Sequence, residues 1–363
     1  MRRETTITGA LVAVILVASC SDDVQLPTTP VDVTVMTRNV YVGTDVDRIL
    51  TAQTPEEFVM RVVETWQMLH ATDFAERAEA LADEIAEAGP HLVGLQEITL
   101  FRTQSPGDAV IGGTVPAEDV YLDFLSILMD ELADRGLSYT VVAQVEATDV
   151  EVPLPLGDGT FNDVRMTDYD VVLARSDVGL SDARVGKYFA MLPVATPTGA
   201  AVEIRRGWVS VNATVEDITI RFVNTHLEPA DYTDQIQAWQ LGELLDLLGD
   251  ETKPIVLVGD LNSEADGSGT PSYQNLLNAG YQDVHQLDPT PDGDALTCCH
   301  DLGLRNAAVQ FTKRIDHILL ANTPVAPEVD AWIVGHDLAD RTASGLWPSD
   351  HAGVVARLTF QDD

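Results

Sequence analysis

The segment His91-Leu92-Val93-Gly94-Leu95-Gln96-Glu97 is a short apolar run that ends in a carboxylate. It follows Gly89-Pro90, which ends an amphipathic helical pattern, and a short apolar run after such a stop predicts a buried β-strand. Glu97 is therefore expected at the end of a strand. Polar side chains at strand ends can meet at one rim of a rigid scaffold, where binding sites are often found.

Five other segments place polar residues next to an apolar strand pattern. They are Asn39 at the end of 31–39, Asn224-Thr225-His226, Gly259-Asp260-Leu261-Asn262, Arg314-Ile315-Asp316-His317 and Ser349-Asp350-His351. Each fragment alone has little specificity, because an Asp-x-Asn sequence also closes ordinary turns and a lone histidine is often a core residue. The ordered set predicts that these side chains gather into one site.

The remaining pattern is typical of one large α/β sandwich. Amphipathic helices are expected over 58–69, 74–88, 121–132 and 239–248, strands at 31–39, 91–97, 139–145, 169–175, 204–215, 218–225, 254–260, 315–321, 330–335 and 350–360, and surface loops at 102–116 and 149–167. No repeat period appears, and no linker divides the chain after residue 30.

The chain is strongly acidic. Its 363 residues contain 58 Asp and Glu against 21 Lys and Arg, a net charge of −37, and the only lysines are Lys187, Lys253 and Lys313. Such a protein repels phosphate backbones unless a local cationic group or a bound metal overrides the global field, so general coating of nucleic acid is excluded. Hydrophobic residues make up 45% of the chain, which is a globular composition.

The N-terminus has the pattern of an export signal. Arg2 and Arg3 precede an apolar run, 11–17, that is too short to span a bilayer. The following Val17-Ala18-Ser19-Cys20 resembles a bacterial lipobox; an ordinary secretory signal with a chance cysteine is the alternative. We expect residues 1–19 to be a signal peptide, 20–30 a tether with lipid on Cys20, and 31–363 the functional domain. The protein is then extracytoplasmic and anchored to a bacterial membrane, or secreted if the lipobox interpretation is wrong.

The other two cysteines are adjacent, at Cys298 and Cys299. In an oxidising compartment they can form a vicinal disulfide. A metal site with His300 is the alternative, although metal-binding cysteines usually stand two or more residues apart. A structural role is favoured.

Together the motifs Gly-Leu-Gln-Glu, Asn-Thr-His-Leu, Gly-Asp-Leu-Asn-Ser, Arg-Ile-Asp-His and Ser-Asp-His resemble the endonuclease/exonuclease/phosphatase superfamily. That superfamily includes DNase I-like nucleases, neutral sphingomyelinases and inositol polyphosphate 5-phosphatases. The resemblance covers 31–360 in the family's motif order. It implies a DNase I-like four-layer α/β sandwich, with two packed mixed β-sheets flanked by helices, and divalent-metal-dependent hydrolysis of phosphoesters.

The resemblance also implies a set of metal ligands. Glu97 is similar to the main metal ligand of the family, with Asn39 beside it, and Asp350 is similar to a second carboxylate on the metal side. Carboxylate and amide oxygens suit a hard cation such as Mg²⁺, or Mn²⁺.

The catalytic roles follow by the same resemblance. Asp260 corresponds to the aspartate that orients or deprotonates the attacking water, and Asn262 to the asparagine that holds the phosphate. His226 is similar to the histidine that contacts the scissile phosphate. His351 and Asp316 are similar to an acid/base pair in which the aspartate fixes the tautomer of the imidazole.

Three arginines are candidates for contact with substrate phosphate: Arg175, Arg205 and Arg206. Salt bridges at the edge of a strand are the alternative for each of them. No subfamily-specific segment identifies the substrate.

The favoured function is hydrolysis of phosphoesters of small molecules or lipid headgroups, by a monomer. An extracellular nuclease is the first alternative, and it is disfavoured by the charge. A catalytically silent surface binding module is the second, although the four residues whose loss would indicate silence, Glu97, Asp260, Asn262 and His351, are all present.

Overall fold

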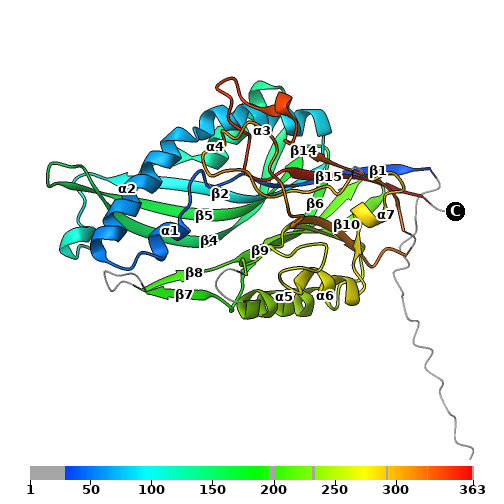
Figure 1. Cartoon of the computed structure of the whole chain (residues 1–363). Helices are drawn as coiled ribbons and strands as arrows, with labels where there is room; N and C mark the ends of the chain where they lie inside the picture. Colours follow the sequence, from blue (N-terminus) through cyan, green and yellow to red (C-terminus); the bar gives the residue numbers. More distant parts are fainter. Residues whose placement is uncertain (1–28, 196–200, 231–233, 292, 325, 362–363) are drawn as a thin grey trace, which may run out of the picture.

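The computed structural model describes residues 29–195, 201–230, 234–291, 293–324 and 326–361. Two mixed β-sheets lie face to face in it, with helices on their outer faces (Figure 1). The predicted signal peptide 1–19 and most of the tether, including Cys20, lie outside the described residues.

The first sheet has seven strands. Their order is β14 (Glu328–Val334), β15 (Gly353–Phe360), β1 (Val31–Asn39), β2 (Leu92–Gln104), β5 (Phe161–Arg175) and β4 (Tyr139–Pro155), with β3 (Asp119–Asp123) paired to β2. On its outer face lie α2 (Pro55–Ala71), α3 (Phe74–Ala88) and α4 (Phe124–Asp134), and the short α1 (Asp47–Leu50) packs beside α2 (Figure 1).

The second sheet has six strands. Their order is β12 (Gln282–Asp283), β13 (Asp316–Ala321), β11 (Ile255–Asp260), β10 (Ile218–His226), β9 (Gly207–Val215) and β6 (Gly179–Lys187). Helices α5 (Asp234–Leu248) and α6 (Ser272–Asn278) cover its outer face, and a small hairpin of β7 (Leu192–Ala195) and β8 (Ala201–Ile204) extends from one end (Figure 1).

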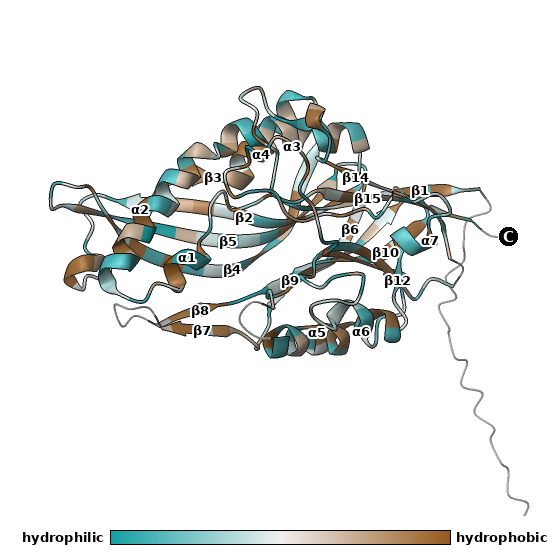
Figure 2. Ribbon diagram, in the orientation of Figure 1, coloured by the Kyte–Doolittle hydropathy of each residue, from teal (hydrophilic) through white to brown (hydrophobic). Residues whose placement is uncertain are grey.

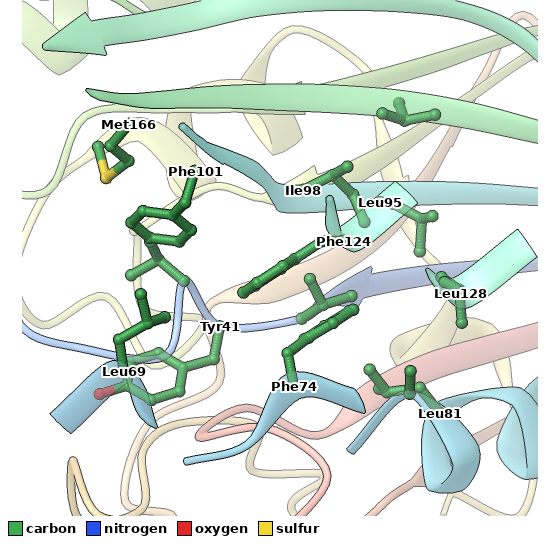
Figure 3. Packing of buried hydrophobic residues seen from close by; sticks show 14 of the residues in the cluster. Tyr41, Leu69, Phe74, Leu81, Leu95, Ile98, Phe101, Phe124, Leu128 and Met166 are labelled. Atoms are coloured by element: carbon green, nitrogen blue, oxygen red, sulfur yellow. The ribbon is translucent and has the colours of Figure 1, made fainter. Parts of the chain in front are cut away.

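Three hydrophobic layers hold these elements together. One lies between α2, α3, α4 and the first sheet, where Phe74 and Phe124 stack with ring centroids 3.6 Å apart (Figure 3). A second lies between the two sheets and a third beneath α5 and α6. The strands carry many hydrophobic residues, although stretches of β4 and β5 are white or teal, and the helices mix hydrophobic and hydrophilic residues (Figure 2). The fold is thus the predicted four-layer α/β sandwich.

Parallel pairing brings the predicted site segments to one edge. β1 runs parallel to β2 with Asn39 opposite Gln96, and β10 runs parallel to β11 with His226 opposite Asp260. Because parallel neighbours end on the same side of a sheet, the polar residues at the ends of these four strands converge.

Buried amide groups connect the two sheets close to this edge. Gln96 Nε2 donates a 2.6 Å hydrogen bond to Asn224 Oδ1, and Asn224 Nδ2 donates to the carbonyls of Leu95 and Val171. The sheets approach so closely that a Cβ atom on Gly94 would lie 2.7 Å from Asn224 Oδ1. This contact fixes the position of one sheet relative to the other.

The prediction of a surface loop at 149–167 is wrong. β4 and β5 pair from Tyr139 opposite Arg175 to Pro155 opposite Phe161, so that 156–160 alone forms the turn. Pro153 and Pro155 suggested a loop, but β4 is the last strand of its sheet, and an edge strand tolerates proline.

Several other boundaries differ from expectation. β2 extends to Gln104, into the expected loop 102–116, whose described remainder includes the short 3₁₀ turn Ala109–Ile111. The expected helix 121–132 begins only at Phe124, because the Asp123 side chain caps it by accepting from the Ser126 amide. The expected strand 204–215 is divided between β8 and β9.

Cys298 and Cys299 are joined as a vicinal disulfide. His300 stacks between Phe311 and Trp347, with ring centroids 4.2 Å from each, and it does not join the cysteines. In the part of the chain described, no helix has the length and apolar character needed to cross a membrane.

Gly259 has φ +148°, and a Cβ atom there would lie 1.8 Å from the carbonyl oxygen of Thr225 on the neighbouring strand. We predict that Gly259→Ala lowers the free energy of unfolding by about 3 kcal/mol or more, because backbone cannot move aside cheaply. The control is Gly242→Ala in α5, where a Cβ atom meets nothing within 4 Å and helix propensity favours alanine by roughly 0.5–1 kcal/mol. Urea unfolding gives the free energy of unfolding of the wild type and of both variants. Equal changes in the two variants would contradict the prediction.

His317 on β13 is buried, donates from Nε2 to the Ser263 carbonyl at 2.9 Å and stacks on Tyr273. Burial, aided by Arg314, lowers its pKa from 6.5 to about 4. The unfolded chain therefore binds this proton more readily, and stability falls as the pH drops from about 6.5 towards 4, by about 1.4 kcal/mol per pH unit. We predict that His317→Gln removes this part of the pH dependence. The test is the free energy of unfolding of the wild type and of His317→Gln at pH 7, 6 and 5. Parallel pH profiles for the two proteins would refute the prediction.

Candidate active site

Asn39 joins the catalytic edges of the two sheets. Its Nδ2 donates to Glu97 Oε1 at 2.9 Å and to Asp260 Oδ2 at 3.1 Å. Its Oδ1 accepts from the Tyr41 amide at 3.0 Å, so the side chain is held at both ends. Asn39 thereby sets the spacing between a carboxylate of the first sheet and a carboxylate of the second.

Glu97 sits at an irregularity in β2. The register between β2 and β5 shifts between Leu95 and Ile98, and Glu97 has φ +60°. Bulges of this kind redirect side chains and are common beside active sites. Glu97 Oε2 accepts a 2.7 Å hydrogen bond from the Val42 amide, which orients the carboxylate.

A tight turn brings Asn262 next to Asp260. The two residues do not share one strand, because β11 ends at Asp260 and Asn262 has φ +46°. Asp260 Oδ1 accepts from the Asn262 amide at 2.9 Å, which closes the turn. The Asn262 Nδ2 group then lies 3.2 Å from His226 Nε2 and 3.0 Å from the Leu227 carbonyl.

His351 and Asp316 form a buried pair. The imidazole donates from Nδ1 to Asp316 Oδ2 at 2.8 Å, while its Nε2 lies 3.9 Å from Asp260 Oδ2. Burial disfavours the imidazolium, but the carboxylates of Asp316, Asp350 and Asp260 outweigh it and raise the pKa of His351 well above its usual range. The geometry favours a protonated His351 whose Nε2 faces the site.

His226 has the opposite electrostatic environment. Burial, followed by the charges of Arg206 and His351, lowers its pKa well below the usual value. Arg206 lies 3.0 Å from His226 Nδ1 and donates from Nε to the buried carboxylate of Glu228 at 3.1 Å. His226 is thus held neutral beside a permanent cation.

The structure brings one of the three candidate arginines to the site. Arg206 contacts His226, but Arg205 points outward and pairs with Glu203 at 2.6 Å. Arg175 ends β5 opposite Tyr139 and pairs with Asp177; the preceding Ala174 lies opposite Leu92, at the start of β2 and five residues before Glu97. Neither Arg175 nor Arg205 is brought together with the predicted site residues.

Asp350 lies on the Glu97 side of the site. Burial raises its pKa to about 6, and of the neighbouring charges His351 lowers it whereas Glu97 raises it. Burial and the charge of Asp316 likewise raise the pKa of Asp260 to about 7. These carboxylates repel one another in a buried space, and a divalent cation would relieve that repulsion.

The donor set therefore fits a metal. Glu97 and Asp350 supply carboxylate oxygens, the ligands that Mg²⁺ prefers. Asn39 turns its Nδ2 towards the acids, and it would bind a metal only through its Oδ1, which also accepts from the Tyr41 amide. A second group is close by, since ligand atoms of Asp260, Asp316 and His351 lie within 4.8 Å of one another.

Two acidic residues of the site were missed in the sequence. Asp168 and Asp170 lie buried on the same side of β5, and burial raises the pKa of Asp168 to about 7. The pKa of Asp170 is raised well above its usual value by burial and by Asp168, and neither of its oxygens has a hydrogen-bond partner among the described residues. The available signal was a pair of acids, two residues apart, at the start of an apolar strand.

A cavity of about 300 Å³ opens beside these groups, and its polar wall includes Glu97, Arg206, His226, Asp260 and His351. Substrate can therefore reach the carboxylates and both histidines from one space.

Comparison with known proteins agrees with this architecture. The sequence profile of the Endonuclease/Exonuclease/phosphatase family matches residues 65–351. No match was found among curated proteins.

Three solved structures are similar in fold. An endonuclease/exonuclease/phosphatase family protein from Leptotrichia buccalis C-1013-b is 16% identical, with a TM-score of 0.54 over 90% of this chain and 99% of that one. A mannosyl-6-phosphatase from Bacteroides thetaiotaomicron VPI-5482 is 16% identical, with a TM-score of 0.52 over 89% and 98%. TDP2 of D. rerio, complexed with a single-strand DNA product, is 18% identical, with a TM-score of 0.50 over 91% and 99%.

The match of the family profile covers most of the chain, and the two packed sheets confirm the fold that the motifs implied. This chain belongs to the Endonuclease/Exonuclease/phosphatase family, a family of phosphoester hydrolases.

Proposed function

We propose that the protein is a divalent-metal-dependent hydrolase of phosphoesters of small molecules or lipid headgroups, in which water attacks phosphorus in line. The observation that carries this proposal is the position of Asn39, which bonds Glu97 of one sheet and Asp260 of the other. Next to these residues lie the His351–Asp316 pair and an open cavity.

Glu97, Asn39 and Asp350 would hold Mg²⁺ or Mn²⁺, which when bound polarises a phosphoryl oxygen. On the protein side, the Asn39 and Val42 hydrogen bonds keep the Glu97 carboxylate in one orientation. A preoriented carboxylate needs little reorganisation during the reaction.

Asp260 is suited to orient and deprotonate the attacking water. Its Oδ1 is engaged by the Asn262 amide, its Oδ2 faces the site, and its pKa of about 7 is close to neutral pH. Asn262 and neutral His226 lie beside it as hydrogen-bonding groups for the phosphate.

His351 is suited to act as general acid. Asp316 takes the hydrogen bond from Nδ1, which leaves Nε2 to donate a proton to the leaving group. The raised pKa of His351 keeps that proton in place at neutral pH.

The charge of the site supports small substrates over long nucleic acids. Of the arginines and lysines in the described residues, Arg206 alone lines the cavity, and it is paired with Glu228. Duplex DNA needs several cationic contacts to displace its counterions. A small phosphoester needs the metal and one or two cationic groups.

We predict that Asp260→Asn and His351→Gln each lower kcat by roughly 10²-fold or more, because each removes a proton-transfer group. Chelation should abolish activity on a chromogenic phosphodiester, and Mg²⁺ or Mn²⁺ should restore it. Arg206→Gln should lower kcat/KM, whereas Arg205→Gln, its neighbour outside the site, should not. Steady-state kinetics with thermal melts as the folding control measure these effects. Full activity after exhaustive chelation would disprove the metal-dependent reaction.

We further propose that the protein is a lipoprotein attached through Cys20. An N-terminal cysteine with several acyl chains anchors a protein stably, whereas a single chain does not. We predict that the wild type sediments with membranes and that Cys20→Ala is soluble or unprocessed, as judged by fractionation and by the mass of the N-terminal peptide. Quantitative recovery of unacylated wild type from the culture medium would exclude the anchor.

A further inference from the structure

The catalytic cavity continues into an apolar chamber. Beyond the carboxylates, its wall is built by side chains of α2, β2, β4, β5 and β8, which include Phe58, Leu69, Phe101, Val152, Met166 and Ile204. Leu69, Tyr41, Phe101 and Met166 follow one another along one side of the core in Figure 3. One space is therefore polar and acidic at one end and hydrocarbon-like at the other.

Hydrogen bonds fix the segment 41–44 in the lining. Tyr41 donates from its hydroxyl to the Leu302 carbonyl at 3.0 Å. Thr44, three residues further along the chain, donates to the Thr65 carbonyl of α2, also at 3.0 Å. Protein interiors rarely leave voids much larger than a water molecule, so an apolar space of this size indicates a ligand.

The lining selects for a particular chemistry. A nucleobase or a sugar would bring several polar atoms that need hydrogen-bond partners when buried. Beyond the catalytic end the lining is mostly methyl, methylene and aromatic groups, to which an aliphatic chain packs without needing hydrogen-bond partners. The polar side chains there are Thr44, Asp45, Asp47, Thr65 and Thr148. The whole cavity, its polar end included, measures about 300 Å³, so the phosphate and the chain share that space.

We propose that the substrate is a phosphoester with a single aliphatic chain, whose phosphate lies at the Asp260 and His351 end and whose chain fills this chamber. The inference rests on the proposed phosphoester hydrolysis and names its substrate class. Burying one methylene group contributes about 0.8 kcal/mol, which corresponds to roughly fourfold in affinity.

The first test is a series of p-nitrophenyl alkyl phosphodiesters, from methyl to octyl, assayed with Mg²⁺ below their micellar concentrations. The leaving group is the same in every ester, so any trend in kcat/KM is due to the length of the alkyl chain. We expect kcat/KM to rise roughly fourfold per added methylene until the chamber is filled. Equal kcat/KM for the methyl and octyl esters would overturn the chain site and leave the hydrolase proposal intact.

The matched variants lie on one strand. Val152→Phe narrows the chamber, and in this variant kcat/KM should depend less on chain length while the methyl ester is still hydrolysed. Val141→Phe adds the same bulk on β4 at a position that is 40% exposed and outside the cavity lining, and it should leave the dependence unchanged. An unaltered dependence in Val152→Phe would contradict the proposed location.

A binding measurement separates this inference from the proposed function. Octyl phosphate and methyl phosphate are titrated calorimetrically into wild type and Val152→Phe, with no turnover required. We expect tighter binding of octyl phosphate to the wild type and a negative heat-capacity change, the mark of buried apolar surface. Failure of every ester to react, with octyl phosphate still preferred, would refute the hydrolase and support the chain site. Equal affinities for the two phosphates would refute the chain site.

Discussion

The hydrogen bond between Gln96 and Asn224 places the two sheets in one register, and the site depends on it. Both side chains are fully buried, and Thr37 completes the amide network on the other side of Gln96. Each member is next to, or two residues from, a site residue: Gln96 precedes Glu97, Asn224 precedes His226 by two, and Thr37 precedes Asn39 by two. A buried polar network with its bonds satisfied specifies one arrangement, because any shift leaves polar groups unpaired. The distances at Asn39 follow from that arrangement.

The convergence of the candidate site residues could be predicted because their motifs combine an unusual polar sequence with an apolar strand on one side. Arg206 could not be distinguished from Arg205, since neighbouring residues of an extended chain face opposite ways and no local signal says which side meets the site. Asp168 and Asp170, at the start of the expected strand 169–175, belong to none of the motifs that carried the prediction. Their role depends on the long pairing of β4 with β5, a tertiary contact that prolines and glycines in the sequence conceal.

The site is electrostatically strained in the folded chain. Glu97, Asp168, Asp170 and Asp260 act on each other's ionisation, with Arg206 as the cation that offsets them. Carboxylates that are buried together cost stability, and this cost is typical of sites arranged for function. A cation that binds the folded state alone would stabilise it by mass action. In the proposed metal-dependent reaction, metal binding, folding and catalysis would therefore be linked through the same group of acids.

The direction of β1 bears on how the proposed substrate would reach the site. The strand enters the sheet at Val31 and reaches the edge that carries the site eight residues later, at Asn39, a distance of roughly 26 Å at 3.3 Å per residue. An anchor attached upstream of Val31 would therefore tether the protein by the end remote from its chemistry, with the chamber open to the aqueous phase. A two-chain lipid would have to be extracted from the bilayer and carried across that distance. A single-chain amphiphile partitions into water as a monomer, and supply by diffusion would then match the enzyme's orientation.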